Sequence, residues 1–275
     1  MAVEVRDPST TRATDRPRRR RSPGRRQQTR ILLSVLSVLL GVLIWDLVSR
    51  NYTAFFLPSP RLTWQGTVEL AANGTLWDSI WASSQRILSG WGLGVLVGIP
   101  VGLLMGCSRW LRLMLDPYIQ FFRFIPPIAF VTLAIIWLGP GEASKIALIF
   151  YTTVFIVALN TLAGVLAVDE LKLRAARALG AGPARTLASV ILPATVPYAV
   201  TGARLAMGNS FLTIVSAEIV AAQSGLGSLI WTARNYAKTE WVFVGIIALG
   251  LLGYFFDWVL RTVARTTLRR YGVTF

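Results

Sequence analysis

Few side chains in this sequence are suited to catalysis. Its 275 residues include no histidine and a single cysteine, Cys107. A Cys/His zinc site, a His-based catalytic triad and an internal disulfide are therefore excluded. No carboxylate pair or nucleophile–base arrangement stands out, and none of the three lysines lies in a glycine-rich phosphate-binding loop. We expect that the chain is not an enzyme, has no metal site and binds no cofactor, so that ATP and Mg²⁺, if used, are bound by another subunit.

The side chains best suited to meet a polar solute lie in one apolar stretch, at about 197–218. Its polar members include Arg204, Asn209, Thr213, Ser216 and Glu218. The three uncharged ones follow at four- and three-residue steps, which places them on one helix face. Ionisable groups are costly in a membrane and usually face the bundle interior or a cavity. Arg204 is suited to attract an oxyanion, whereas Glu218 would repel one. The alternative is structural, with interhelical hydrogen bonds and an Arg–carboxylate pair, and Arg123 shares this ambiguity.

The elements that must position these groups are membrane helices. Hydrophobic residues make up 54% of the chain and charged residues only 15%, against about 25% charged in soluble domains. Several windows approach the roughly 20 apolar residues that cross a bilayer. We therefore predict an all-α membrane protein with six transmembrane helices, at about 31–49, 84–107, 117–138, 145–167, 197–218 and 241–260.

The basic residues orient these helices. The formal net charge is +15, and the 28 basic residues include ten before Ile31, two in 108–116, four in 168–195 and four at the C-terminus. Short loops rich in Lys and Arg stay in the cytoplasm, so we predict that both termini and these two loops lie inside. The distribution fits a membrane protein better than a nucleic-acid groove, and we expect no nucleic-acid partner. A membrane-anchored nucleic-acid-binding protein that uses the Arg-rich tail remains an alternative.

Glycine and proline predict how the helices pack. Five glycines at four-residue spacing should let a neighbouring helix approach closely: Gly90, Gly94, Gly98, Gly102 and Gly106. In the third predicted span, Pro126 and Pro127 should kink or break the helix. The stretch 219–233, interrupted by glycines, is too short to span, and we predict a re-entrant or interfacial turn on the outer side.

A polar island, DELKLRAARALGAGPARTLASVILP, occupies 169–193 between two apolar stretches. Residues 171–179 are good helix formers and end at Gly180, a natural helix stop. Gly182 and Pro183 then predict a turn before a second amphipathic stretch. A short, exposed, cationic helix–turn–helix on the cytoplasmic side is suited to bind a cytoplasmic partner protein.

This island resembles the EAA motif, E-A-A-x3-G-x9-I-x-L-P, of permease subunits of ATP-binding-cassette (ABC) importers. The matching positions in register are Ala175, Ala176, Gly180, Val190, Leu192 and Pro193. From about Phe56 to Arg270, segments such as SSQRILSGWGLGVLVGIPVGLLMG and SAEIVAAQSGLG look like the subgroup that handles nitrate, sulfonate, taurine and bicarbonate. One departure is that Arg174 occupies the position of the motif's glutamate.

The resemblance implies a type I importer permease in the bacterial plasma (inner) membrane. Its expected partners are a second copy of the permease, two ATPase subunits, an extracytoplasmic substrate-binding protein and the lipid bilayer. The substrate is expected to be a small oxyanion: an aliphatic sulfonate, taurine, nitrate or bicarbonate. The alternatives are a heterocyclic nutrient (a pyrimidine precursor or a riboflavin-like compound) or an ion-coupled secondary transporter.

The resemblance implies the coupling residues, whereas the regions and the translocation path follow from composition and from the polar residues. The ATPase-coupling residues are Arg174, Ala175, Ala176, Arg177, Leu179, Gly180 and Ala181. The expected translocation path comprises Arg204, Asn209, Thr213, Ser216, Glu218, Pro126 and Pro127. The expected regions are a disordered cytoplasmic tail (1–30), a first transmembrane helix (31–49), an extracytoplasmic segment with a short interfacial helix (50–80), a permease core with coupling loop 168–195 (81–265) and a cytoplasmic C-terminal tail (266–275).

Overall fold

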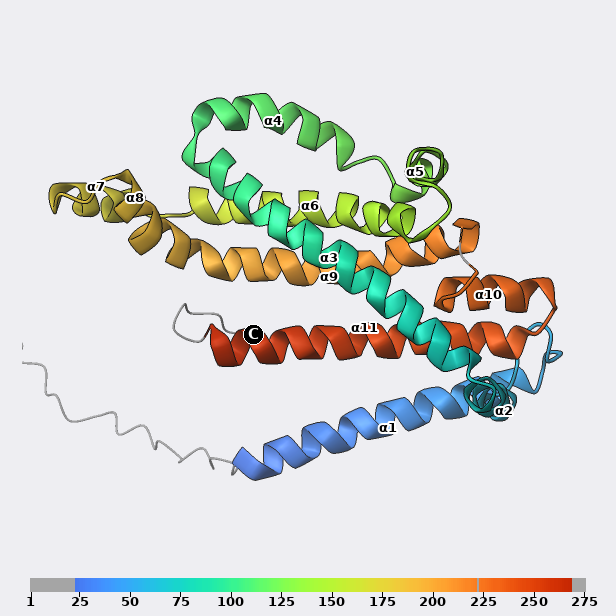
Figure 1. The fold of residues 1–275 in the computed structure, drawn as a ribbon. Helices are drawn as coiled ribbons and strands as arrows, with labels where there is room; N and C mark the ends of the chain where they lie inside the picture. Colours follow the sequence, from blue (N-terminus) through green and yellow to red (C-terminus); the bar gives the residue numbers. More distant parts are fainter. Residues whose placement is uncertain (1–22, 222, 269–275) are drawn as a thin grey trace, which may run out of the picture. The chain divides into compact units, whose positions relative to one another are not determined.

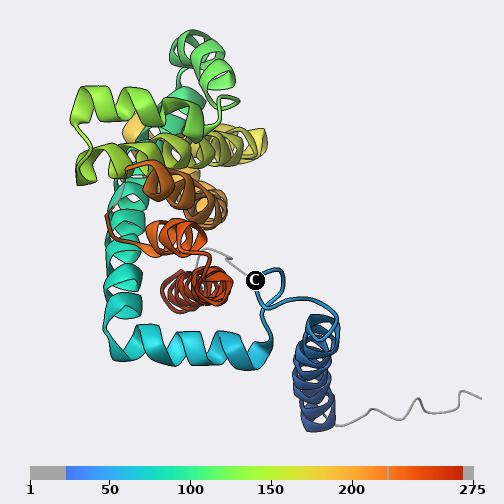
Figure 2. The ribbon, with the colours of Figure 1, turned by 90° about the vertical axis from the view of Figure 1, so that its right-hand side faces the viewer.

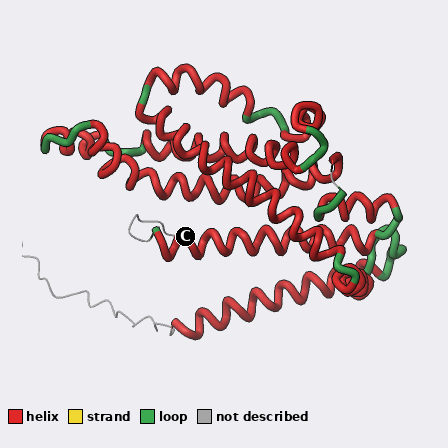
Figure 3. Tube along the Cα trace, in the orientation of Figure 1, coloured by secondary structure: helices red, strands yellow, loops and turns green. Residues whose placement is uncertain are grey.

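The computed structural model describes residues 23–221 and 223–268, which are helical with short turns and contain no strand (Figures 1 and 3). The helices are α1 (Pro23–Ser49), α2 (Pro60–Ala72), α3 (Thr75–Cys107), α4 (Arg109–Phe122), the 3₁₀ turn η1 (Pro127–Phe130), α5 (Val131–Leu138), α6 (Glu142–Leu166), α7 (Glu170–Ala178), α8 (Pro183–Thr186), the π-helical turn η2 (Leu187–Ile191), α9 (Leu192–Ala221), α10 (Leu226–Asn235) and α11 (Thr239–Thr267).

The chain divides into two units, residues 1–48 and 49–275. The described part of the first unit is α1, which carries the candidate span Leu32–Ser49. The helix already begins at Pro23, so the prediction of a disordered segment is wrong for residues 23–30, while residues 1–22 lie outside the described chain. Gln and Arg are good helix formers, and a helix nucleated in the apolar segment extends through them at little cost.

The second unit confirms the predicted membrane architecture. By length and composition, α3, α6, the continuous segment Pro183–Val220 and α11 can each cross a membrane. The remaining span is a bent pair, Arg109–Phe122 and Pro127–Leu138, whose limbs meet at 90°. With α1, the described residues therefore hold five candidate spans, or six when the bent pair is counted as one.

Several helix ends differ from the predicted ones. The structure starts α3 at Thr75, within the segment expected to be extracytoplasmic, because Gly74 has a φ of +83° and closes the preceding turn. The predicted cytoplasmic turn at 108–116 is helical, since the Ser108 hydroxyl accepts the Leu111 N–H and caps α4. At the other end of the chain, the predicted C-terminal tail at 266–275 begins within α11, and residues 269–275 lie outside the described chain.

The predicted break at the two prolines is confirmed. Pro126 is extended, with φ −60° and ψ 138°, and Pro127 opens η1. Carbonyl groups freed by the break need partners inside a membrane. The Tyr151 hydroxyl supplies one, because it donates to the carbonyl of Phe122 and lies 3.4 Å from that of Ile125.

The fifth predicted span also begins earlier than expected. The π-helical turn η2 joins α8 to α9 without a gap, so that Pro197 lies inside a helix rather than at its start. At the outer end, α9 continues to Ala221, and the predicted re-entrant turn at 219–233 consists of the end of α9, a short loop and the ten-residue helix α10.

The glycine strip allows close approach of a neighbouring helix, as predicted, and the structure identifies that helix as α6. A Cβ atom added at Gly102 would lie 2.4 Å from the Ala158 carbonyl oxygen, and one at Gly94 would lie 2.5 Å from Thr153. The backbones of α3 and α6 therefore approach more closely than side chains would permit. α6 in turn packs on α9, with Gly202 against Asn160.

Four buried apolar clusters lie between helices of the described chain, and two of them border the elements above. One consists of Ile87, Ile149, Met207 and Ile214, from α3, α6 and α9. The other lies where α2, α3, α10 and α11 meet: Leu70, Leu76, Leu226, Leu229 and Val244. Figure 2 views α11 nearly end-on, with α2 and α3 passing beside it.

The close approach of α3 and α6 predicts opposite effects for two glycines of the same helix. Gly102→Ala should destabilise the protein by about 1–3 kcal/mol, because the methyl group meets backbone atoms of α6. Gly92 has no atom within 4 Å of its added Cβ, so Gly92→Ala should stabilise the helix by roughly 0.5–1 kcal/mol. Thermal unfolding of both variants in detergent measures the difference. Equal melting temperatures would contradict the packing.

Candidate functional site

The polar island folds as a capped helix, α7, that is closed by a glycine. The Asp169 carboxylate accepts the Leu171 N–H at 2.8 Å and caps the first turn. At the other end, Ala181 N–H bonds to the Ala176 carbonyl and Gly180 N–H to the Arg177 carbonyl. This pattern requires a left-handed residue, and Gly180 has a φ of +77°. The loop geometry is therefore fixed by local sequence.

One face of α7 is apolar and exposed. Leu171 is 70% exposed and Leu179 is 88% exposed, and Ala175 and Ala178 lie between them on the same side. Arg174 lies beside this face and pairs with Glu170 at 2.8 Å, one helical turn earlier. An exposed apolar patch of this kind is typical of a protein contact.

The seven expected coupling residues all belong to this loop. Arg174, Ala175, Arg177, Leu179 and Gly180 are exposed, whereas Ala176 and Ala181 are half-buried.

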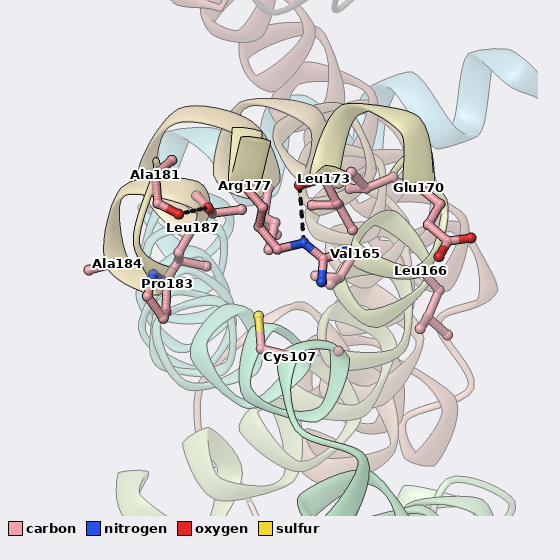
Figure 4. Close-up of a pocket in the computed structure, with 14 residues that line it drawn as sticks. Cys107, Val165, Leu166, Glu170, Leu173, Arg177, Ala181, Pro183, Ala184 and Leu187 are labelled. Carbon is pink, nitrogen blue, oxygen red and sulfur yellow. Dashed lines mark hydrogen bonds between the residues drawn. The ribbon is translucent and has the colours of Figure 1, made fainter. Parts of the chain in front are cut away.

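A cavity of about 750 Å³ lies between this loop and the ends of α3 and α6 (Figure 4). Its lining is mostly apolar and includes Val165, Leu166 and Leu187. Arg177 points into the cavity while its Nε donates to the Leu173 carbonyl at 3.3 Å, and Cys107 faces it from α3. The position of the single cysteine beside this loop was not predictable, because the cavity joins segments far apart in the chain.

A second cavity, of about 490 Å³, lies at the break between α4 and η1. Residues from the break, α6 and α9 line it: Arg123, Phe124, Ile125, Pro126, Pro127, Tyr151, Thr152, Phe155, Ile156, Leu159, Asn160 and Asn209. Arg123 is the one lysine, arginine or carboxylate residue in this lining, and its guanidinium carbon lies 4.6 Å from the centroid of the Phe124 ring. The cavity therefore presents a cation and two amide side chains, which are suited to hold a small anion.

The structure brings only part of the expected translocation path to this cavity. Pro126, Pro127 and Asn209 line it, and Arg123 joins them. Thr213 is buried behind it, where its hydroxyl donates to the Asn209 carbonyl at 3.0 Å. Ser216 is half-buried further along α9 and does not line this cavity.

The two charged members of the expected path form ion pairs elsewhere. Arg204 donates to the Asp257 carboxylate of α11 from Nε at 3.0 Å and from Nη2 at 2.9 Å. Glu218 is fully buried and pairs with Arg86 of α3 at 2.7 Å. Both pairs follow the structural alternative, with partners that the sequence did not indicate. An ion pair of Arg86 could have been predicted from the sequence, since a charge inside an apolar segment needs a partner.

Nothing in residues 23–221 and 223–268 gathers three or more His, Cys, Asp or Glu side chains that could hold a metal ion. The candidate site consists of the cavity beneath α7, the cavity at the α4–η1 break and the exposed face of α7.

Comparison with known proteins identifies the family. Residues 94–269 match the family described as "Binding-protein-dependent transport system inner membrane component". A probable ABC transporter permease of Brucella melitensis is 42% identical over 85% of this chain and 94% of its own. The taurine transport system permease TauC of Escherichia coli is 37% identical, over 87% and 89%. The bicarbonate transport system permease CmpB of Synechococcus elongatus is 34% identical, over 87% and 90%.

The fold is also found among solved structures. A chain of the MetNI methionine ABC transporter in an inward-facing conformation superposes with a TM-score of 0.58, at 20% identity, covering 69% of this chain and 96% of that one. The family match and the identities agree with the membrane architecture. The chain belongs to the binding-protein-dependent transport system inner membrane components, and it is a multi-pass inner-membrane permease subunit of an ABC importer whose ATP is hydrolysed by a separate ATPase subunit.

Proposed function

We propose that this permease imports a small oxyanion through a path that includes the cavity at the α4–η1 break. The observation that carries the proposal is that Arg123 is the one lysine, arginine or carboxylate residue in that lining. Asn160 and Asn209 add amide groups, although the Asn160 amide also donates to the Ile156 carbonyl at 2.8 Å. Taurine and bicarbonate, which the names of two relatives give as their substrates, both carry oxyanion groups.

The cavity is suited to a path that a second copy of the permease completes. Arg123 and Phe124 are exposed in the single chain, and Phe124 is 73% exposed. An exposed cation beside an exposed ring is costly against lipid and favourable against protein or water. A partner copy across this surface would enclose the cavity between two such cations, which favours binding of an anion over that of a cation.

We also propose that α7 couples the permease to its ATPase subunit, with one ATPase for each permease chain. Leu171, Ala175 and Leu179 give an apolar contact, and the small residues permit close approach. Because α8, η2 and α9 follow without a gap, movement of the loop is transmitted directly into a membrane helix. The extracytoplasmic binding protein delivers substrate on the opposite side.

The coupling proposal predicts the effect of a charge on the exposed face of α7. Leu179→Glu should abolish co-purification with the ATPase subunit and substrate-dependent ATP hydrolysis, because the contact would bury an unpaired carboxylate. Thr266→Glu, an exposed position near the end of α11, is the matched control and should leave the complex intact. Pull-down from detergent extracts measures co-purification of the ATPase subunit with each of the two variants. An intact Leu179→Glu complex would contradict the role of α7.

The oxyanion proposal predicts the effect of removing the cation. Arg123→Gln should reduce taurine uptake into proteoliposomes by about tenfold or more, the scale of a lost charge-assisted hydrogen bond. Arg109→Gln removes an exposed arginine of α4 that does not line the cavity, and it should leave uptake unchanged. Bicarbonate and a neutral heterocycle serve as parallel probes. Unchanged anion uptake by Arg123→Gln, or uptake of the heterocycle alone, would reject the proposal.

A further inference from the structure

An ionic network joins four helices at the end of α9 that lies opposite the coupling loop; its Arg86, Glu218 and Lys145 side chains are buried, and that of Glu142 is 58% exposed. Arg86 of α3 is 3% exposed, and Glu218 of α9 is completely buried. The Arg86 Nη1 lies 2.7 Å from a Glu218 oxygen, while its Nε and Nη2 contact both oxygens of Glu142 at 2.5 and 2.8 Å. Lys145, also buried, pairs with Glu142 at 3.1 Å. One arginine thus links α3, α6 and α9 through two carboxylates.

The same carboxylate holds the start of α10. Glu218 accepts the Ser83 hydroxyl at 2.8 Å and the Gly227 N–H at 2.8 Å. Ser83 in turn accepts the Leu226 N–H at 2.9 Å, so its hydroxyl connects α10 to α3 as well. The donors around Glu218 therefore come from α3 and from the backbone of α10.

Gly225 shows how closely the loop before α10 fits this carboxylate. Its φ is +119°, and an added Cβ would lie 2.3 Å from a Glu218 oxygen. The loop also receives a hydrogen bond from Arg86, whose Nη1 donates to the Ser224 carbonyl at 2.6 Å. Glycine is required here for both backbone conformation and space.

A buried ion pair is an inefficient way to gain stability, because an apolar pair of similar volume often serves as well. Its directional contacts, however, fix the relative positions of the groups that make them. Glu218 lies near one end of α9, and the other end of that helix continues through η2 and α8 into the α7 loop. Thirty residues of α-helix span about 45 Å, enough to connect the two sides of a bilayer.

We propose that Arg86 and Glu218 are positioning residues for transport, which lock the ends of α3, α6, α9 and α10 opposite the coupling loop into one body. Motion of the α7 loop then rotates α9 together with this body. Docking of the binding protein on the outer side changes ATP hydrolysis through the same connection. The inference rests on the proposed coupling role of α7. Without the lock, the loop still moves with the ATPase, but the outer ends do not follow.

The experiment uses the assembled transporter, permease with its ATPase subunit, in proteoliposomes with the binding protein present or absent. Glu218→Gln keeps the size of the side chain and an acceptor oxygen but removes the charge. Arg86→Gln combined with Glu218→Gln removes both charges, which avoids leaving one buried charge unpaired. Glu69→Gln is the matched control, because Glu69 of α2 belongs to a partly exposed pair with Lys238 at 3.7 Å.

Two measurements distinguish changes at the outer end of α9 from changes at the coupling loop. Binding-protein stimulation of ATP hydrolysis reports transmission from the outer side to the ATPase. Maleimide labelling of Cys107, the single cysteine of this chain, reports movement beside the coupling loop, because Cys107 lines the cavity that α7 covers. After labelling with and without ATP and vanadate, the permease subunit is isolated and its mass is measured.

The expected result is that Glu218→Gln and the double variant keep their ATP-dependent change in Cys107 labelling but lose about tenfold of the stimulation by binding protein, a typical coupling between sites. Glu69→Gln should behave as the unchanged protein. Stimulation within about twofold of normal in the double variant overturns the proposal. Parallel loss of stimulation, nucleotide response and assembly in both variants also overturns it, because the network would then only maintain the fold. If Cys107 labelling in the unchanged protein does not depend on nucleotide, the proposed coupling role of α7 is rejected instead.

Discussion

The close approach of α3 and α6 is the constraint on which the other features depend. A helix pair in lipid gains little from the hydrophobic effect, so its contact must come from packing and from hydrogen bonds. The glycine face of α3 provides the packing along almost the whole length of α6, from Gly90 beside Ile149 to Gly106 beside Val165. One end of this seam holds Arg86 and Glu142, and the other holds the cavity beneath α7. The seam therefore sets the distance between the proposed lock and the proposed coupling site.

Where the break of the third span leaves backbone groups without helical partners, a side chain of α6 replaces one of them. The break of the third span frees carbonyl groups, and Tyr151 of α6 bonds to that of Phe122. The same residue stacks edge-on against Phe130 and Phe155 at about 5 Å, so its ring is held between the break and its own helix. Contacts of Tyr151 on both sides thus hold the break beside the Arg123 cavity against α6.

Sequence reasoning succeeded where the determining interactions are local and failed where they join distant segments. The α7 loop was predictable because Asp169 and Gly180 act within a few residues of their own positions. The glycine strip and the two prolines likewise act through their own backbone. The pairs Arg86–Glu218 and Arg204–Asp257 were not predictable, because partners 132 and 53 residues apart meet only after the helices pack. The spans predicted to begin at Pro117 and Pro197 begin earlier in the structure, because Ser108 caps α4 and because η2 joins α8 to α9 without a gap.

Arg174 illustrates how a change in a motif can be absorbed locally. It stands where the family motif has glutamate, yet Glu170 lies one turn before it and pairs with it at 2.8 Å. A glutamate that precedes an arginine by four residues is the favourable order on a helix, and the exposed pair is worth only about 0.2–0.5 kcal/mol. A docking surface on an ATPase can break such a weak pair at small cost and bond to either member. Glu170 therefore places a carboxylate at the edge of the same face, one turn before the position of the motif's glutamate and beside the guanidinium of Arg174.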